Sequence, residues 1–383
     1  MSKNTSTIML RRTKKIVAAI LAAILMLLLM FVPQPALEGA RKGLLLCGST
    51  IIPSLLPFLV LSSFIISSGT ADWCGRFLEP VTELIFRLPG SSGAALVLGA
   101  IGGYPVGADA VAKLCQNGSL TKREAERLLC FAINSSPAFI IGAVGAGFFK
   151  NVQAGILLYI VHLLASFTIG LVMRIGQKRR ESGRGKHIHV TRRADNLSAA
   201  FVKSVTGSAQ SIVTICAFVI LFSALNSLLN YTGTIQLLAD TVSHIIPPPA
   251  SDPSFYSRAA VGLLEVTNGC AAASGSVGLP AILLTAAILG FSGLSVQFQV
   301  ISLIKESGIS AKLFILTRIL HVFFSTVFAL VLFKIFPSAI PTSSVVTAFA
   351  TYQNNLIVSC HSIPAVCAML FIIAILLLSL VNV

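Results

Sequence analysis

The stretch GAIGGYPVGADA, residues 99–110, decides how this chain has to fold. It lies in a segment apolar enough for a lipid bilayer, but four glycines and one proline interrupt it. Proline removes a backbone donor and glycine allows unusual backbone angles, so a continuous helix is disfavoured here. Because unpaired backbone groups in lipid cost several kcal/mol each, the break has to lie against protein or a water-filled cavity.

The composition of the whole chain is typical of an integral membrane protein. Of the 383 residues, 55% are hydrophobic and 11% are charged, whereas a soluble domain has about 25% charged residues. The net charge is +15, but the basic residues flank apolar segments, which is the positive-inside pattern and not a nucleic-acid surface. The eight cysteines form no CxxC pair, and His162, His244, His321 and His361 are isolated in the sequence. No catalytic, metal or cofactor motif appears, so we expect neither an enzyme nor a cofactor.

A basic loop divides the apolar segments into two halves. Residues 16–32 form an uninterrupted apolar run, which we interpret as a retained transmembrane helix with the N-terminus in the cytoplasm. Residues 174–193 contain eight Lys or Arg and one Glu, which predicts a cytoplasmic loop. The expected regions are a tail with the first helix (1–42), a first repeat (43–175), the basic loop (176–197), a second repeat (198–340) and a C-terminal helix (341–383).

Further segments are long enough to cross a bilayer. Residues 43–69 qualify, but Pro53 and Pro57 interrupt them. Two short amphipathic segments, 73–90 and 231–248, either lie in the membrane interface or re-enter the membrane. Uninterrupted helices are expected at 154–173, 200–229, 313–336 and 364–381.

The two halves match element by element. In each half a long helix is followed by a short amphipathic stretch, two broken segments and an uninterrupted helix. The paired segments are 53–65 with 213–225, 99–108 with 262–271, and 132–140 with 288–296. Because one crossing precedes the first half and a cytoplasmic loop precedes the second, the halves start on opposite sides of the membrane. We therefore predict an all-α polytopic membrane protein with two inverted-topology repeats and discontinuous or re-entrant helices, as in secondary transporters.

Glu265 is the most informative polar residue at the breaks. It has no basic residue within six positions, and intramembrane carboxylates usually face a cavity and serve a function. The alternative is a protonated structural acid that bonds to a neighbouring helix. Asp109 is a weaker candidate, because Lys113 follows one helical turn later and can pair with it.

The paired breaks together form the predicted substrate site. A helix N-terminus at the glycine-rich break would offer backbone donors to an anion. The alternatives are that the glycines only allow close helix packing and that the polar break formed by Asn134, Ser135 and Ser136 only caps a helix beginning near Pro137. The candidate binding residues are Gly102, Gly103, Tyr104, Pro105, Gly107, Asn134, Ser135, Ser136, Glu265, Thr267, Asn268, Ser292 and Ser295.

Three runs of sequence resemble a known family. They are GGYPVGA at 102–108, LTKREAERLLCFAINSSPAFIIGAVG at 120–145 and GLLEVTNG at 262–269. These runs resemble the YlbJ-type sporulation integral membrane proteins of endospore-forming bacteria, which carry the nucleoside-recognition, or Gate, domain. The resemblance covers residues 40–340, although the second half lacks a second Gly-Tyr-Pro.

The resemblance implies a role in forming resistant spores. It implies transport of dipicolinate, a flat aromatic dianion, from the mother cell towards the forespore across the outer forespore membrane. A helix N-terminus, a tyrosine ring and amide donors would also suit a nucleobase, so a nucleoside carrier is the alternative, and a non-transporting scaffold for the spore envelope is another. The expected partners are the bilayer and the small-molecule substrate, with a second copy or other sporulation membrane proteins as further candidates and no nucleic acid.

Overall fold

The computed structural model is helical throughout the part of the chain that it describes. That part comprises residues 22–68, 77–177, 197–249 and 252–341, with Ile16, Ala19 and Ile20. It contains no strand, and four of its helices are long and apolar enough to cross a membrane. A bent pair, Ala22–Phe31 with Pro33–Ser49, would make a fifth span. The all-α, polytopic prediction is confirmed.

The helices of the two halves follow one another in the same order. The first half contains α2 (Pro33–Leu46), η1 (Cys47–Ile51), α3 (Ile52–Ser67), η2 (Thr82–Phe86), α5 (Ser92–Gly102), α6 (Tyr104–Gln116), α7 (Lys122–Ala132), η3 (Ala138–Phe148) and α8 (Val152–Arg174). The second half contains α9 (Leu197–Tyr231), α10 (Thr234–Ile245), α11 (Phe255–Leu264), α12 (Val266–Ala273), α13 (Gly278–Phe291), α14 (Gly293–Ile304), η4 (Lys305–Ser307), α15 (Lys312–Ile335) and η5 (Pro337–Ala339).

Three of the predicted uninterrupted helices are confirmed, as α8, α9 and α15. The amphipathic segment 231–248 contains α10, and the described part of segment 73–90 contains η2. The predicted helix at 364–381 and the basic loop beyond Gln177 lie outside the described residues.

The interruption predicted at Pro53 and Pro57 is wrong. α2, η1 and α3 follow one another without a gap, and Pro53 lies in the first turn of α3. The π-helical turn η1 comes immediately before it, and such turns accommodate local changes in the helical bonding pattern. Only Pro57 lies inside α3. The boundary predicted after residue 42 falls within α2, so one helix joins the N-terminal region to the first repeat.

The first break is a hairpin. A Cβ added to Gly107 would stand 3.0 Å from the Cα of Gly99, although eight residues of straight helix would separate them by about 12 Å. The chain therefore reverses between α5 and α6. At the tip, Gly103 has φ 93° and ψ −178°, a conformation that favours glycine because it has no Cβ.

The matching break in the second half is also a hairpin. A Cβ on Gly269 would stand 2.2 Å from the Cα of Gly262, so α11 and α12 fold back on each other. Glu265 forms the tip in an extended conformation. The chain thus reverses at both of these predicted breaks. Whether the segments 73–90 and 231–248 re-enter the membrane stays a prediction.

The second break of each half interrupts a helix where a hairpin tip rests. The non-helical residues 133–136 separate α7 from η3, and Ser292 separates α13 from α14. Ser292 and Gly293, the first residue of α14, both have positive φ. A Cβ on Gly103 would stand 3.3 Å from the Cβ of Ser136, and one on Gly293 would stand 3.0 Å from the backbone nitrogen of Val266. Each hairpin tip thus packs against the broken helix of its own half.

Contacts between the halves occur in reciprocal pairs. α6 packs against α14 and α12 against η3, while α7 packs against α15 and α13 against α8. The final helices of the two halves, α8 and α15, pack against each other. Such reciprocity is what a two-fold relation between halves produces. The direction of each half relative to a membrane stays a prediction.

The serines at matching positions in α3 and α9 have similar partners. Ser63 accepts a hydrogen bond from Lys113 Nζ at 2.9 Å, and Ser223 accepts one from Asn268 Nδ2 at 3.4 Å. Lys113 lies on α6 and Asn268 on α12, so each serine ties the second arm of its own hairpin to a long helix. Lys113 also pairs with Asp109, as the sequence spacing predicts.

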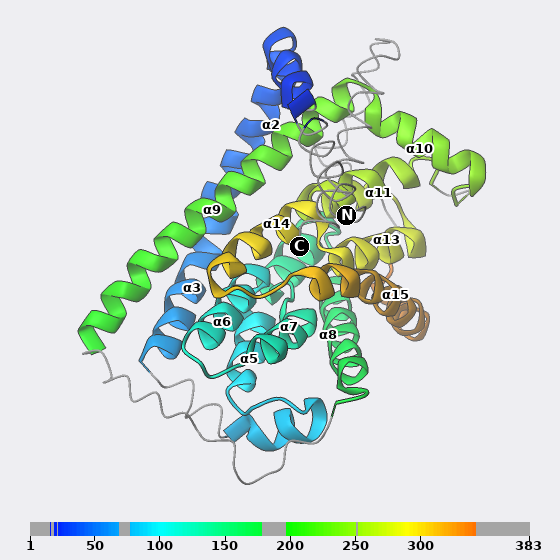
Figure 1. Ribbon diagram of the computed structural model, residues 1–383. Coiled ribbons are helices and arrows are strands. Elements are labelled where there is room, and N and C mark those ends of the chain that lie inside the picture. The colour runs from blue at the N-terminus through cyan, green and yellow to red at the C-terminus, as the bar shows by residue number, and fades with distance from the viewer. Residues whose placement is uncertain are drawn as a thin grey trace, which may run out of the picture.

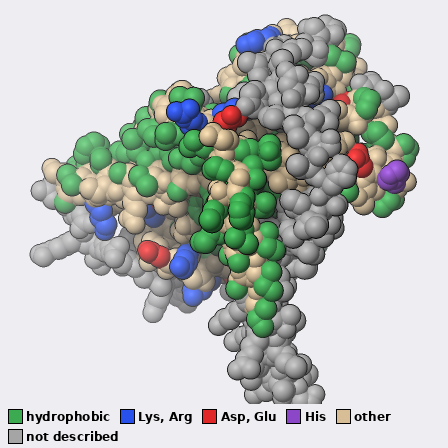
Figure 2. Space-filling model, turned by 90° about the horizontal axis from the view of Figure 1, so that it is seen from above, with side chains coloured by type: hydrophobic (Ala, Val, Ile, Leu, Met, Phe, Trp, Pro, Cys, Tyr) green, Lys and Arg blue, Asp and Glu red, His purple; other side chains and the backbone are tan. Residues whose placement is uncertain are grey.

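The outer surface suits lipid. α9 runs beside α2 and α3 along one side of the molecule (Figure 1). Figure 2 shows hydrophobic side chains over much of the described surface. On α15, Leu316, Ile319 and Phe323 are each about 60% exposed. Apolar surface of this extent is expected in a bilayer and not in water.

The substitution Gly269→Ala tests the second hairpin. The added Cβ would force the two arms apart, and overpacking of this kind costs about 1–3 kcal/mol. The matched control is Gly207→Ala in α9, where a Cβ meets no atom within 4 Å and alanine favours the helix by about 1 kcal/mol. We expect a lower midpoint of thermal unfolding in detergent for Gly269→Ala only. Equal midpoints for the two variants would contradict the hairpin.

Candidate functional site

Hairpin tips and helix breaks from both halves meet in one region. They line a cavity of about 100 Å³, which apolar side chains of η1, α3 and α9 complete. The predicted site residues that line it are Gly103, Tyr104, Pro105, Ser135, Ser136, Glu265 and Thr267. The structure thus brings together residues that the sequence places in separate halves.

The other predicted site residues lie beside the cavity without lining it. They are Gly102, Gly107, Asn134, Asn268, Ser292 and Ser295. Gly102 and Gly107 allow close packing within the first hairpin, which is the alternative considered for the glycines. Ser295 accepts a hydrogen bond at 3.1 Å from Nε2 of Gln299, which does line the cavity and which the sequence analysis missed.

The polar break before Pro137 does cap the following helix, but through Ser136 and not through Asn134. Its Nδ2 donates to the carbonyl oxygen of Phe131 at 3.0 Å, so it binds the end of α7. Ser136 provides the cap, since its Oγ accepts from the backbone N–H of Phe139 at 3.2 Å. The Oδ1 of Asn134 is buried without a hydrogen-bond partner.

Glu265 caps its own helix at the cavity wall. Its side chain is buried, with 1% of the residue exposed. One carboxylate oxygen accepts from the Thr267 N–H at 3.0 Å and the other from the Asn268 N–H at 2.6 Å. A helix N-terminus leaves such donors unpaired and favours a negative charge. Glu265 therefore has a structural role at α12 and lies in the cavity as well.

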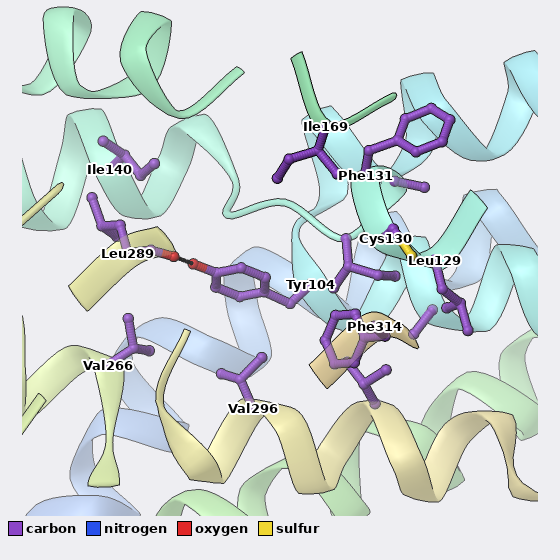
Figure 3. Packing of buried hydrophobic residues seen from close by; sticks show 14 of the residues in the cluster. Tyr104, Leu129, Cys130, Phe131, Ile140, Ile169, Val266, Leu289, Val296 and Phe314 are labelled. Atoms are coloured by element: carbon purple, nitrogen blue, oxygen red, sulfur yellow. Dashed lines mark hydrogen bonds between the residues drawn. The ribbon is translucent and has the colours of Figure 1, made fainter. Parts of the chain in front are cut away.

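Four helical segments begin at this cavity. Tyr104, Ala138 and Val266 are the first residues of α6, η3 and α12, and all three line it. Val296, in the first turn of α14, lines it too. Figure 3 shows the Tyr104 ring among Leu289, Val266 and Val296. Because helix N-termini carry partial positive charge, their convergence favours a negatively charged group.

Tyr104 connects the first hairpin to the broken helix of the second half. Its hydroxyl donates to the carbonyl oxygen of Leu289, near the end of α13, at 2.8 Å (Figure 3). This bond satisfies a carbonyl that the break would otherwise leave without a helical partner. The hydroxyl proton is therefore already used, and the ring is the part of Tyr104 most available to a ligand.

Arg318 performs the reciprocal task for the first half. It lies on α15, is 0% exposed, and donates to the carbonyl oxygens of Cys130 at 2.7 Å and Ile133 at 3.2 Å, where α7 ends. Its guanidinium also lies 4.7 Å from the ring centre of Phe314. Within the described residues it makes no ion pair, so the negative end of α7 is what balances it. A basic residue inside an apolar helix was the sequence signal for it.

His162 and His321, which are isolated in the sequence, are stacked in the structure. Their ring centres lie 4.5 Å apart at an angle of 28°. The rings meet where α8 and α15 pack together, so each half contributes one histidine at a matching place. His162 Nε2 accepts the backbone N–H of Ser135, a cavity residue, at 3.1 Å.

The substitution Arg318→Met tests the cap on α7. It would leave two buried carbonyls unpaired, at about 1–3 kcal/mol for each lost partner. We expect a much lower unfolding midpoint for Arg318→Met and a smaller loss for Arg318→Lys, which keeps a charge but not the two-pronged geometry. Arg123→Met, at an exposed position of α7, is the control. If Arg318→Met and Arg123→Met unfold at the same temperature, the cap contributes nothing.

The chain is similar in sequence to one protein-family model and to known membrane proteins. The family model Gate, described as nucleoside recognition, matches residues 49–152, which include the first hairpin and the first broken helix. The sporulation integral membrane protein YlbJ of Bacillus subtilis (strain 168) is 35% identical over 324 residues, which cover 79% of this chain and 78% of that protein. The inner membrane protein YjiG of Escherichia coli (strain K12) is 29% identical over 93 residues, 24% of this chain and 60% of that protein. No solved structure matches.

The similarity to the Bacillus protein extends over both halves, because 79% of the chain is aligned. The Gate match covers the hairpin and break of the first half only. Taken with the apolar helices, these matches show an integral membrane protein with a Gate region. The chain belongs to the family of the YlbJ sporulation integral membrane proteins.

Proposed function

We propose that the protein is a secondary transporter whose substrate, a small planar heteroaromatic metabolite, binds between the two hairpin tips. The observation that carries the proposal is the convergence of four helix N-termini from both halves on one cavity. Transporters built from inverted repeats bind their substrates at such paired breaks. A scaffold protein has no need of a cavity where helix breaks of both halves meet.

Dipicolinate is the substrate that we propose first. It carries two carboxylates, and the helix N-termini around the cavity favour negative charge. Arg318 adds a full positive charge behind the α7 break. Glu265 opposes this, so a dianion requires a neutral Glu265 or a second positive charge near the cavity. The name of the Bacillus relative supports a role in sporulation, and for that role we propose the outer forespore membrane as the location.

A nucleoside is the second candidate, supported by the description of the Gate family model. Its hydroxyl and amino groups would donate to Glu265 and Gln299, both of which line the cavity. The apolar surfaces of Val296 and the Tyr104 ring would suit the face of either heterocycle.

The cavity has to widen before it can hold a substrate. A cavity of about 100 Å³ is smaller than the roughly 300 Å³ or more of ordinary ligand pockets. Entry of a substrate therefore requires a hairpin tip to move away from the broken helix on which it rests. Two contacts would have to break, one on each side of the site. They are the contact between Gly103 and Ser136 and the contact between Gly293 and Val266.

Uptake into proteoliposomes tests the proposal. Purified protein is reconstituted, and accumulation of labelled dipicolinate and of labelled uridine is compared with that of empty vesicles. Accumulation of dipicolinate supports the first candidate, and accumulation of uridine alone supports the second. If neither solute enters under any imposed ion gradient, the scaffold alternative replaces transport.

Glu265→Gln and Tyr104→Ala test the site in cells. Glu265→Gln removes the charge and one of two acceptors at the start of α12, and Tyr104→Ala removes the ring and the bond to Leu289. Loss of a buried charge-assisted hydrogen bond corresponds to about tenfold or more in rate. We expect spores of both strains to contain far less dipicolinate at normal protein levels. Glu306→Gln, at an exposed position, is the control, and normal filling in all three strains would refute the site.

A further inference from the structure

The stacked histidines are buried polar groups that the proposed binding site does not use. His162 is 1% exposed and His321 0%. Each makes one hydrogen bond, and Nδ1 of each ring is buried without a partner. Two buried polar atoms nearby also lack partners, the Oδ1 of Asn134 and the Nε of Arg318. Unpaired polar atoms at this depth call for water, a proton or a functional role.

The hydrogen bonds fix which nitrogen of each ring carries the proton. His162 Nε2 accepts from the Ser135 N–H, so its proton resides on Nδ1. His321 Nε2 lies 3.3 Å from the carbonyl oxygen of His162, which can only accept, so Nε2 of His321 carries the proton. Only His162 therefore uses a basic nitrogen to hold a cavity residue in place.

A second proton on His162 would break that attachment. The proton would bind Nε2, which would then be a donor that faces the donor N–H of Ser135. The two groups would separate, and the N–H of Ser135 would be free to turn to the cavity that Ser135 lines. The imidazolium charge would remain directly behind it.

The surroundings make this protonation depend on an anion. Three titratable or charged side chains face the pair. They are Tyr104 of α6, whose ring centre lies 6.2 Å from that of His162, Cys130 near the end of α7, and Arg318 of α15, which donates to the Cys130 carbonyl oxygen. No carboxylate among the described residues forms an ion pair with either imidazole. A buried charge is costly unless it is paired. A carboxylate of the substrate in the cavity would supply the missing partner.

We propose that His162 is the proton-binding residue of the transport cycle, and that its protonation releases the Ser135 N–H to bind a carboxylate of the substrate. This inference rests on the proposed function, because it needs an anionic substrate in the cavity. One proton enters from the aqueous phase and is bound at Nε2, and no covalent bond to the substrate forms. By linkage, the proton and the substrate each raise the affinity for the other.

Proton uptake on binding is the first test. Calorimetric titration of the purified protein with dipicolinate, in buffers of different ionisation enthalpy, measures protons bound per substrate. We expect about one proton for wild type and for His244→Gln, at an exposed position of α10, and about none for His162→Gln, which keeps an acceptor but cannot take the charge. Binding by wild type without proton uptake, or uptake unchanged in His162→Gln, would overturn the inference and leave the proposed function intact.

Hydrogen–deuterium exchange tests the attachment without any substrate. The peptide covering residues 131–140 is followed from about pH 7.5 to about pH 4, with exchange corrected for its intrinsic pH dependence. In wild type without substrate we expect protection to persist across this range, because an unpaired charge on the buried His162 is too costly to form. His162→Gln should stay protected at every pH, and His162→Phe, which keeps a ring but has no acceptor, should be unprotected at every pH.

The two tests separate the two failures. If exchange behaves as expected but neither dipicolinate nor uridine binds, the attachment exists and the proposed function is wrong. If the exchange profiles of wild type, His162→Gln and His162→Phe coincide, His162 is not a switch, whatever the protein transports. Size-exclusion profiles of each variant show whether it is folded, and in the absence of substrate only His162→Phe is expected to deviate from wild type.

Discussion

Every backbone group freed by a helix break inside a membrane has to find a partner, and this constraint organises the molecule. Each half has a hairpin and a broken helix, and each break frees carbonyl and N–H groups where no lipid can pair with them. The partners come from a few side chains. Arg318 pairs the end of α7, Tyr104 pairs the end of α13, and Glu265 pairs the start of α12.

Two of these partners act across the halves. Arg318 belongs to the second half and caps a helix of the first, whereas Tyr104 belongs to the first half and binds a carbonyl of the second. Neither half can therefore satisfy its own breaks alone. A shift of one half relative to the other would strain these buried bonds at once, so motion at one hairpin is coupled to the opposite broken helix. The reciprocal helix contacts provide the same coupling through packing.

The sequence predicts well where helices span and where they break. It does not predict that the chain reverses at a break or which residues then come into contact. Apolar length alone identifies α8, α9 and α15, and Gly, Pro and polar residues mark all four breaks. The same residues would equally suit a kinked helix, and only the contact of Gly99 with Gly107 makes the first break a reversal. That contact depends on tertiary packing, which no local pattern encodes. The role of Arg318 was hidden for a related reason, since its partner carbonyl at Ile133 lies 185 positions away.

Under the proposed function, the interactions around the cavity are ones that a substrate can replace. In this structure the protein itself supplies what the helix ends need: a carboxylate at α12, a hydroxyl at α13 and an imidazole at Ser135. A substrate with a carboxylate and a flat ring offers groups of the same kind. Exchange of one hydrogen-bonded partner for another costs little, whereas leaving a buried group unpaired costs much. In the proposed transport cycle, a ligand that replaces these partners would therefore widen the cavity at little cost, whereas a solute that replaces none of them would not.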